Sequence, residues 1–203
     1  MKRIRIGIAA AAILALSACG GMHPGAGLVV GSDSVSADRV DEVAGSLCEA
    51  LGASGQGDVG GKDARQQAAN LLLTLTAARQ AADELGVEVE PSQYAVTNSD
   101  TEALKAQFPD SDLDDLTKVI AISKESSVLL AAIGQDQAGS DAANEQAQQA
   151  GQAYVQDFLA DSDVSIDPRY GLDDKGQPKD DTDSLSVRVS DPAEDVPSTQ
   201  QCS

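Results

Sequence analysis

Residues 63–86 read DARQQAANLLLTLTAARQAADELG, and this stretch decides the fold. Its apolar residues recur in alternating steps of four and three, at Ala64, Ala68, Leu71, Leu75, Ala78, Ala82 and Leu85. Residues at this spacing share one face of an α-helix. Glycine commonly ends a helix because it adopts the left-handed conformation without strain, and Gly86 stands at the end of the pattern. The stretch therefore predicts one long helix, over about 64–85, with a continuous apolar face.

Helical spacing recurs on both sides of this segment. Ser36 is a suitable N-cap for an amphipathic helix over about 37–51. Further helices are predicted at about 92–97, 99–107, 112–137 and 140–161. The apolar face of the third of these contains Val119, Ile122, Leu129 and Ile133, and that of the last contains Ala143, Ala147, Ala150, Tyr154 and Phe158. The fold class indicated is mainly α.

Two short stretches have the composition of β-strands. Residues 26–36 (AGLVVGSDSVS) predict a strand, a Gly-Ser-Asp turn and a return strand, and Val164-Ser165-Ile166 predicts a late strand. Beyond residue 171 the chain is rich in Asp, Pro and Ser and is expected to be mostly irregular, with one further candidate strand at 184–189. Aromatic residues make up only 2% of the chain and Trp is absent, so the core is built from Ala, Leu and Val. One modest helical domain fits this composition.

The first residues have the pattern of a bacterial lipoprotein signal. Basic residues within 1–5 precede an apolar run over 6–16, which is shorter than the roughly 20 residues of a transmembrane helix. Leu16-Ser17-Ala18-Cys19 resembles a lipobox. We expect residues 1–18 to be removed, Cys19 to be lipidated, and residues 19–25 to tether the protein to the extracytoplasmic face of the cell membrane. The alternative is a plain secretory signal followed by an unmodified cysteine.

The charge of the chain restricts its partners. Of 14 basic residues, three lie in the signal segment, while all 33 acidic residues lie beyond it, so its removal changes the net charge from −19 to −22. A polyanionic surface argues against nucleic acid as a partner and against flat adhesion to anionic lipid. The acidic surface serves solubility or attracts basic partners.

Two cysteines remain once Cys19 is lipidated, in a compartment that permits disulfides. A bridge between Cys48 and Cys202 would pin the C-terminus to the first helix. The alternative, two free thiols, stays open at this stage.

Residues for catalysis or metal binding are sparse. The only histidine, His23, lies in the tether, which removes Ser-His and Cys-His nucleophile pairs and histidine-bearing metal sites. Gly61-Lys62 lacks the Ser or Thr of a phosphate-binding loop. The acidic clusters at 110–115 and 180–183 lack the pattern of a calcium loop, so a solvated, helix-capping role is expected. We therefore expect no enzyme activity, no catalytic residue, no metal and no small-molecule cofactor.

Three segments carry a family resemblance. Residues 28–36 (LVVGSDSVS), leading into a helix from Ala37, resemble the opening of the SurA N-terminal domain family, in which A-x-V-N-G-x-x-I-S precedes the first helix. Residues 84–92 (ELGVEVEPS) are similar to the E-x-G-I-x-V-S link of that family. Residues 164–171 (VSIDPRYG) resemble the V-x-V-N-P-R-Y-G element of SurA-like lipoproteins in actinobacteria. Gly31-Ser32 replaces the Asn-Gly of the family's first turn.

The resemblance covers residues 26–171 and implies a SurA N-terminal-like helical domain. The early and late strands would form a small two- or three-stranded β element, and residues 172–203 would be an acidic, mostly irregular tail. The resemblance implies an ATP-independent chaperone, or holdase, for unfolded secreted or envelope proteins. Residues 92–163 have no sheet-rich parvulin segment, so prolyl isomerase activity is not implied. The alternative is a non-chaperone binding or scaffold lipoprotein in envelope assembly. The sequence does not indicate which residues bind a client.

Overall fold

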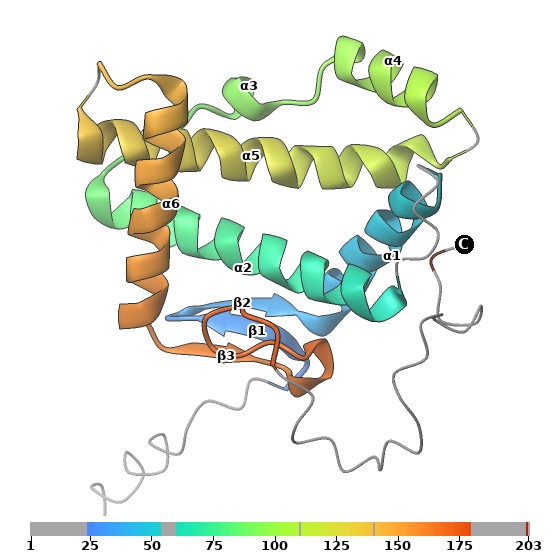
Figure 1. Cartoon of the computed structure of the whole chain (residues 1–203), viewed down its shortest axis with the longest axis horizontal. Coiled ribbons are helices and arrows are strands. Elements are labelled where there is room, and N and C mark those ends of the chain that lie inside the picture. Colours follow the sequence, from blue (N-terminus) through green and yellow to red (C-terminus); the bar gives the residue numbers. More distant parts are fainter. Residues whose placement is uncertain (1–23, 54–59, 110, 140, 180–201, 203) are drawn as a thin grey trace, which may run out of the picture.

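The computed structural model describes residues 24–53, 60–109, 111–139, 141–179 and 202 (Figure 1). The predicted signal peptide, Cys19 and the candidate strand at 184–189 lie outside these ranges. Within them, no helix combines the length and apolar character needed to cross a membrane.

The long helix predicted over 64–85 lies at the centre of the molecule. It is α2 (Gly61–Leu85), and it packs against β1 and three helices, α1 (Ala37–Ala53), α5 (Leu113–Ala138) and α6 (Asn144–Asp161). Neighbouring elements cover most of the circumference of α2. Most of the predicted face is therefore buried, and so are four residues outside it, Leu72, Leu73, Ala77 and Ala81. Leu71 and Leu85, at the margin of that face, are half-buried. As predicted, Gly86 ends the helix in the left-handed conformation, with φ at 68°.

The sheet consists of the early and late strands. β1 (Ala26–Val30) lies between β2 (Asp33–Ser36) and β3 (Val164–Ile166), and both pairings are antiparallel. Leu28 and Val30, on the face of β1 toward the helices, are almost fully buried. The fold class predicted from the sequence, mainly α with a small β element formed by early and late strands, is confirmed.

Two short helices form an arm on the outer side of α5 (Figure 1). They are α3 (Pro91–Tyr94) and α4 (Asn98–Gln107). The side chain of Thr97 caps α4 by accepting a hydrogen bond from the backbone N–H of Asp100, at 3.2 Å. We use "the arm" below for residues 91–107.

The last helix differs from its prediction in start and in buried face. α6 begins at Asn144 rather than near 140, and its buried residues are Ala147, Gly151, Val155 and Leu159. Tyr154 and Phe158 are half-buried and Ala143 is exposed. α6 crosses α5 so closely that small residues, rather than aromatic ones, occupy the crossing.

The chain closes against the start of α1 and the side of α2. A 3₁₀ turn, η1 (Pro168–Tyr170), buries Tyr170, whose hydroxyl donates a hydrogen bond to the backbone carbonyl of Ala37 at 3.3 Å. Leu172 is also in the core. A tight turn follows, in which the Asp173 carboxylate accepts from the backbone N–H of Gln177 at 2.7 Å. The packed structure therefore extends past residue 171, which is the domain boundary expected from the sequence.

Candidate functional site

Two adjoining hollows lie between α2 and α5. One, of about 340 Å³, begins beside β2, and the other, of about 430 Å³, lies at the far end of α2, beside residues 87–91. Both are lined by Arg79, Tyr94 and Glu125. We refer to the two hollows together as the α2–α5 groove. It is a concave surface that joins apolar residues from several elements of the described structure, and we take it as the candidate binding site.

Apolar side chains form the walls of the groove at both ends. Beside β2 they come from three elements, β2, α2 and α5, and are Val35, Leu72, Leu75, Ala121 and Ile122. At the far end they are Ala82, Val87, Val89, Pro91 and Leu129. Most of the α2 and α5 residues are buried at the base, whereas those of β2 and of residues 87–91 are half-buried or exposed at the rim. The groove therefore offers an apolar base with an open rim.

An ion pair links α2 to α5 in the middle of the groove. The guanidinium of Arg79 donates from Nε and from one terminal nitrogen to the two carboxylate oxygens of Glu125, both at 2.7 Å. The side chain of Glu125 is only 16% exposed, whereas that of Arg79 is 54% exposed. A bidentate pair of this kind fixes the spacing of the two helices and keeps both charges neutralised inside the groove.

A second ion pair holds the arm against α5. The Lys124 ammonium donates to the carbonyl of Ala95 at 2.9 Å and to the carboxylate of Asp100 at 2.6 Å. Hydrogen bonds from Lys124 and then from Thr97 lower the pKa of Asp100 from 3.8 to about 2. The contribution of this pair to stability is therefore complete above about pH 4 and is lost as the pH falls through 2. Through this pair the arm keeps Tyr94 at the groove.

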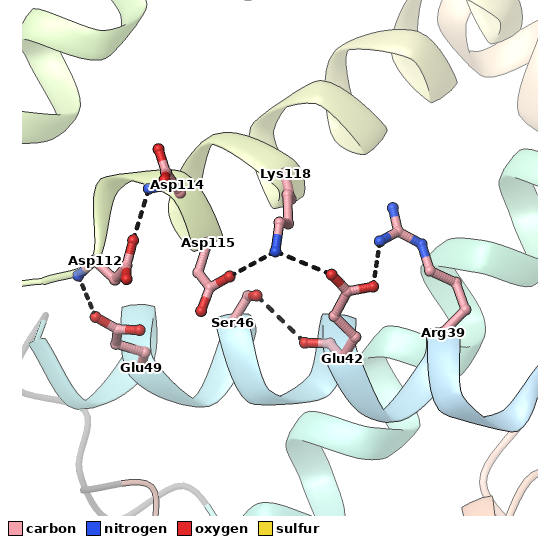
Figure 2. A network of polar contacts seen from close by, with 8 residues as sticks. All are labelled: Arg39, Glu42, Ser46, Glu49, Asp112, Asp114, Asp115 and Lys118. Atoms are coloured by element: carbon pink, nitrogen blue, oxygen red, sulfur yellow. Dashed lines mark hydrogen bonds and ion pairs between the residues drawn. The ribbon is translucent and has the colours of Figure 1, made fainter.

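A polar network ties α1 to the first half of α5 (Figure 2). The carboxylate of Glu42 accepts from Arg39 at 2.6 Å and from Lys118 at 3.0 Å, and Lys118 also donates to Asp115 at 2.9 Å. Hydrogen bonds from Lys118 and Arg39 lower the pKa of Glu42, and those to Asp115 and Glu42 raise the pKa of Lys118. These exposed pairs link the two helices and neutralise the cations at the β2 end of the groove.

The two cysteines left open by the sequence are paired. Cys48, in α1, and Cys202 form a disulfide with their Cα atoms 4.8 Å apart, and Cys202 is buried. A separate hollow of about 390 Å³ beside this bridge is lined by Arg65 of α2 and by Arg169, which lies 3.5 Å from the carboxylate of Asp41. The bridge therefore joins the end of the chain to the end of α1.

The structure describes only some of the other residues that the sequence analysis named. Cys19 and His23 lie outside the described residues. Asp112 caps α5 by accepting from the backbone N–H of Asp114 at 2.9 Å, which confirms the capping role for this part of the acidic cluster. Among the described residues, no group of three His, Cys, Asp or Glu side chains is arranged to hold a metal ion.

The sequence placed Leu75 of α2 and Ile122 and Leu129 of α5 on apolar helix faces, but it did not indicate that they line a groove. Arg79 and Glu125 are 46 positions apart, and nothing local to either indicates that they meet. Val87 and Val89 lie in a four-residue stretch without regular structure, which is too short to carry a pattern. Comparisons of the chain with protein-family models, curated proteins and solved structures find no match. The family resemblance therefore stays a prediction from the residues quoted for it.

Proposed function

We propose that the protein is a lipoprotein, anchored through Cys19 to the extracytoplasmic face of the cell membrane, that acts as an ATP-independent holdase. It binds segments of unfolded secreted or envelope proteins and does not isomerise prolines. The observation that supports this proposal is the α2–α5 groove, where half-buried apolar side chains such as Val35, Val87 and Val89 line an open rim above a buried apolar base. The tether of residues 19–25 keeps the groove near the membrane from which such proteins emerge.

The width of the groove favours binding one segment at a time. Its base is formed by single side chains of α2 and α5, such as Leu75 and Ile122, and the arm borders it at Tyr94. An extended strand or one helix face fits such a surface, because alternate side chains enter the apolar hollows while the polar backbone stays at the rim. Release needs no energy source if the contact area is small, since affinity is then modest.

A second candidate function is a scaffold with one defined envelope partner. The observation that favours it is the burial of the two apolar helix faces: Leu72 and Leu75 of α2, and Ile122 and Leu129 of α5, are each less than 10% exposed. A general holdase benefits from a broad apolar surface, whereas a specific partner needs only a small complementary one.

Filling the groove is expected to abolish holdase activity. Ala121 lines the groove and is half-buried, so Ala121→Trp puts an indole into the hollow beside β2. Ala153→Trp, on the exposed side of α6, is the matched control. We expect the wild-type chain and Ala153→Trp to slow the aggregation of a denatured secreted protein, measured by light scattering at equal molar amounts, and Ala121→Trp to have lost this effect.

Two outcomes of this experiment bear on the choice of function. If Ala121→Trp protects as well as the wild type while keeping its thermal unfolding midpoint, the groove is not the client site. If the wild-type chain protects no client, but crosslinking in cells recovers one envelope protein from the groove, the scaffold replaces the holdase.

The lipid anchor is tested separately. Cys19→Ala removes the only thiol that the lipobox offers for acylation, so incorporation of radioactive palmitate is expected to fall to background. Palmitate incorporation that survives Cys19→Ala contradicts the anchor and leaves the groove untouched.

A further inference from the structure

The charges along the α2–α5 groove are balanced at one end only. At the β2 end, Arg39 and Lys118 are held by the carboxylates of Glu42 and Asp115. In the middle, Arg79 and Glu125 neutralise one another. The β2 end and the middle of the groove therefore have little net charge for a ligand to recognise.

The far end of the groove carries an excess of negative charge. Asp83, Glu88 and Glu90 line it together with Glu125, and the only cation among the described lining residues is Arg79, which is already paired with Glu125. In the part of the chain that the structure describes, neither the Asp83 nor the Glu88 side chain has a hydrogen bond or ion pair. Both residues are exposed and line the hollow, so their charges border the space that a ligand would occupy.

Apolar walls stand directly beside these carboxylates. Val87 and Val89 alternate in sequence with Glu88 and Glu90, and Pro91 and Leu129 complete the lining. A ligand that fits this surface has apolar side chains for the walls and positive charges for the rim. Attraction between charges at such a partly enclosed rim is stronger than in open solvent, because the protein walls have a lower dielectric constant than water.

We propose, on the basis of the holdase function above, that the groove selects polypeptide segments in which apolar residues are flanked by Lys or Arg. Charge complementarity points to this partner and argues against a second copy of the chain, which carries the same net charge, −22 once residues 1–18 are removed. The same net charge steers basic segments toward the protein from a distance at low ionic strength.

The proposal is tested with two labelled peptides that share one apolar core, one flanked by lysines and the other by glutamates. Fluorescence anisotropy measures their binding to the full chain in phosphatidylcholine vesicles, with empty vesicles as the blank. We expect the lysine-flanked peptide to bind about tenfold more tightly at about 50 mM salt, with most of the difference lost at about 500 mM.

Variants that replace acidic side chains with neutral amides test whether the far end of the groove causes the preference for the lysine-flanked peptide. Asp83→Asn with Glu88→Gln is expected to remove most of the tenfold preference. The control, Asp157→Asn with Glu145→Gln, removes the same charge from exposed positions of α6 and is expected to leave the preference unchanged. Equal losses in both variants mean that overall charge, not the groove, selects the peptide, and overturn the proposal.

The two peptides also separate this proposal from the function on which it rests. Equal binding of both peptides, blocked by Ala121→Trp, overturns the charge preference and leaves the holdase function standing. Binding of neither peptide overturns both.

Discussion

Alanine in place of Gly134 is expected to destabilise the fold by about 3 kcal/mol or more, the upper part of the range for inserting one carbon atom into a packed core. Gly134 faces α6 where it crosses α5, and a Cβ added there would lie 1.7 Å from the backbone carbonyl oxygen of Ala147. Gly151 faces back across the crossing, and its added Cβ would lie 1.9 Å from the carbonyl oxygen of Leu130. Since backbone blocks both positions, no side chain can rotate away and the helices must separate.

Urea unfolding followed by circular dichroism measures this effect, and Gly45 supplies the control. Gly45 lies within α1, and a Cβ added there would meet no atom within 4 Å. Because alanine loses less entropy than glycine on forming a helix, Gly45→Ala is expected to add about 0.5–1 kcal/mol. If Gly134→Ala unfolds at the same urea concentration as Gly45→Ala, the close crossing of α5 and α6 is wrong.

Breaking the bridge between Cys48 and Cys202 is expected to produce the other large loss of stability. The bridge spans a sequence separation of 154 residues. Closing a loop of this length in the unfolded chain stabilises the folded state by at most about 5 kcal/mol in the chain-entropy view. The loss is expected both in Cys48→Ala with Cys202→Ala and in the wild type treated with a reducing agent, measured as the fall in the urea midpoint.

Comparing the two ways of breaking the bridge separates the effect of the crosslink on stability from the effect of lost side-chain packing. Cys202 is 2% exposed, so alanine also leaves a small cavity, whereas reduction keeps both sulfur atoms. Agreement between them assigns the loss to the crosslink. A wild-type midpoint that does not respond to the reducing agent, together with two thiols that react with a labelling reagent before any reduction, contradicts the bridge.

The helices were predictable because their information is local. The period of Ala and Leu between 64 and 85 defined α2, and Gly86 ended it as expected. The sequence did not reveal how many sides of α2 are covered, because a helix surrounded by neighbours buries residues off its predicted face, such as Leu73 and Ala77. In α6 the sequence placed Tyr154 on the buried face, whereas the structure buries Gly151 there. A glycine adds nothing to an apolar pattern, but it permits the closest approach of two helix backbones.

The groove was not predictable because it depends on contacts between distant segments. Arg79 meets Glu125, and Lys124 meets Asp100, only after α2, α5 and the arm have packed. The sequence pattern of each helix marks its buried face, but not the gap left between two such faces. The sequence did not decide whether Cys48 and Cys202 are bridged, for a similar reason. The cysteine count allowed a bridge, but only the fold brings the two Cα atoms to 4.8 Å from each other.

Site-specific photo-crosslinking in cells tests the groove as the client site most directly. A photoreactive amino acid is placed at Ala121, in the groove, or at Ala153, on the exposed side of α6. We predict adducts with several secreted or envelope proteins from position 121 and none above background from position 153. The same adducts from both positions, or none from either, would contradict a client site between α2 and α5.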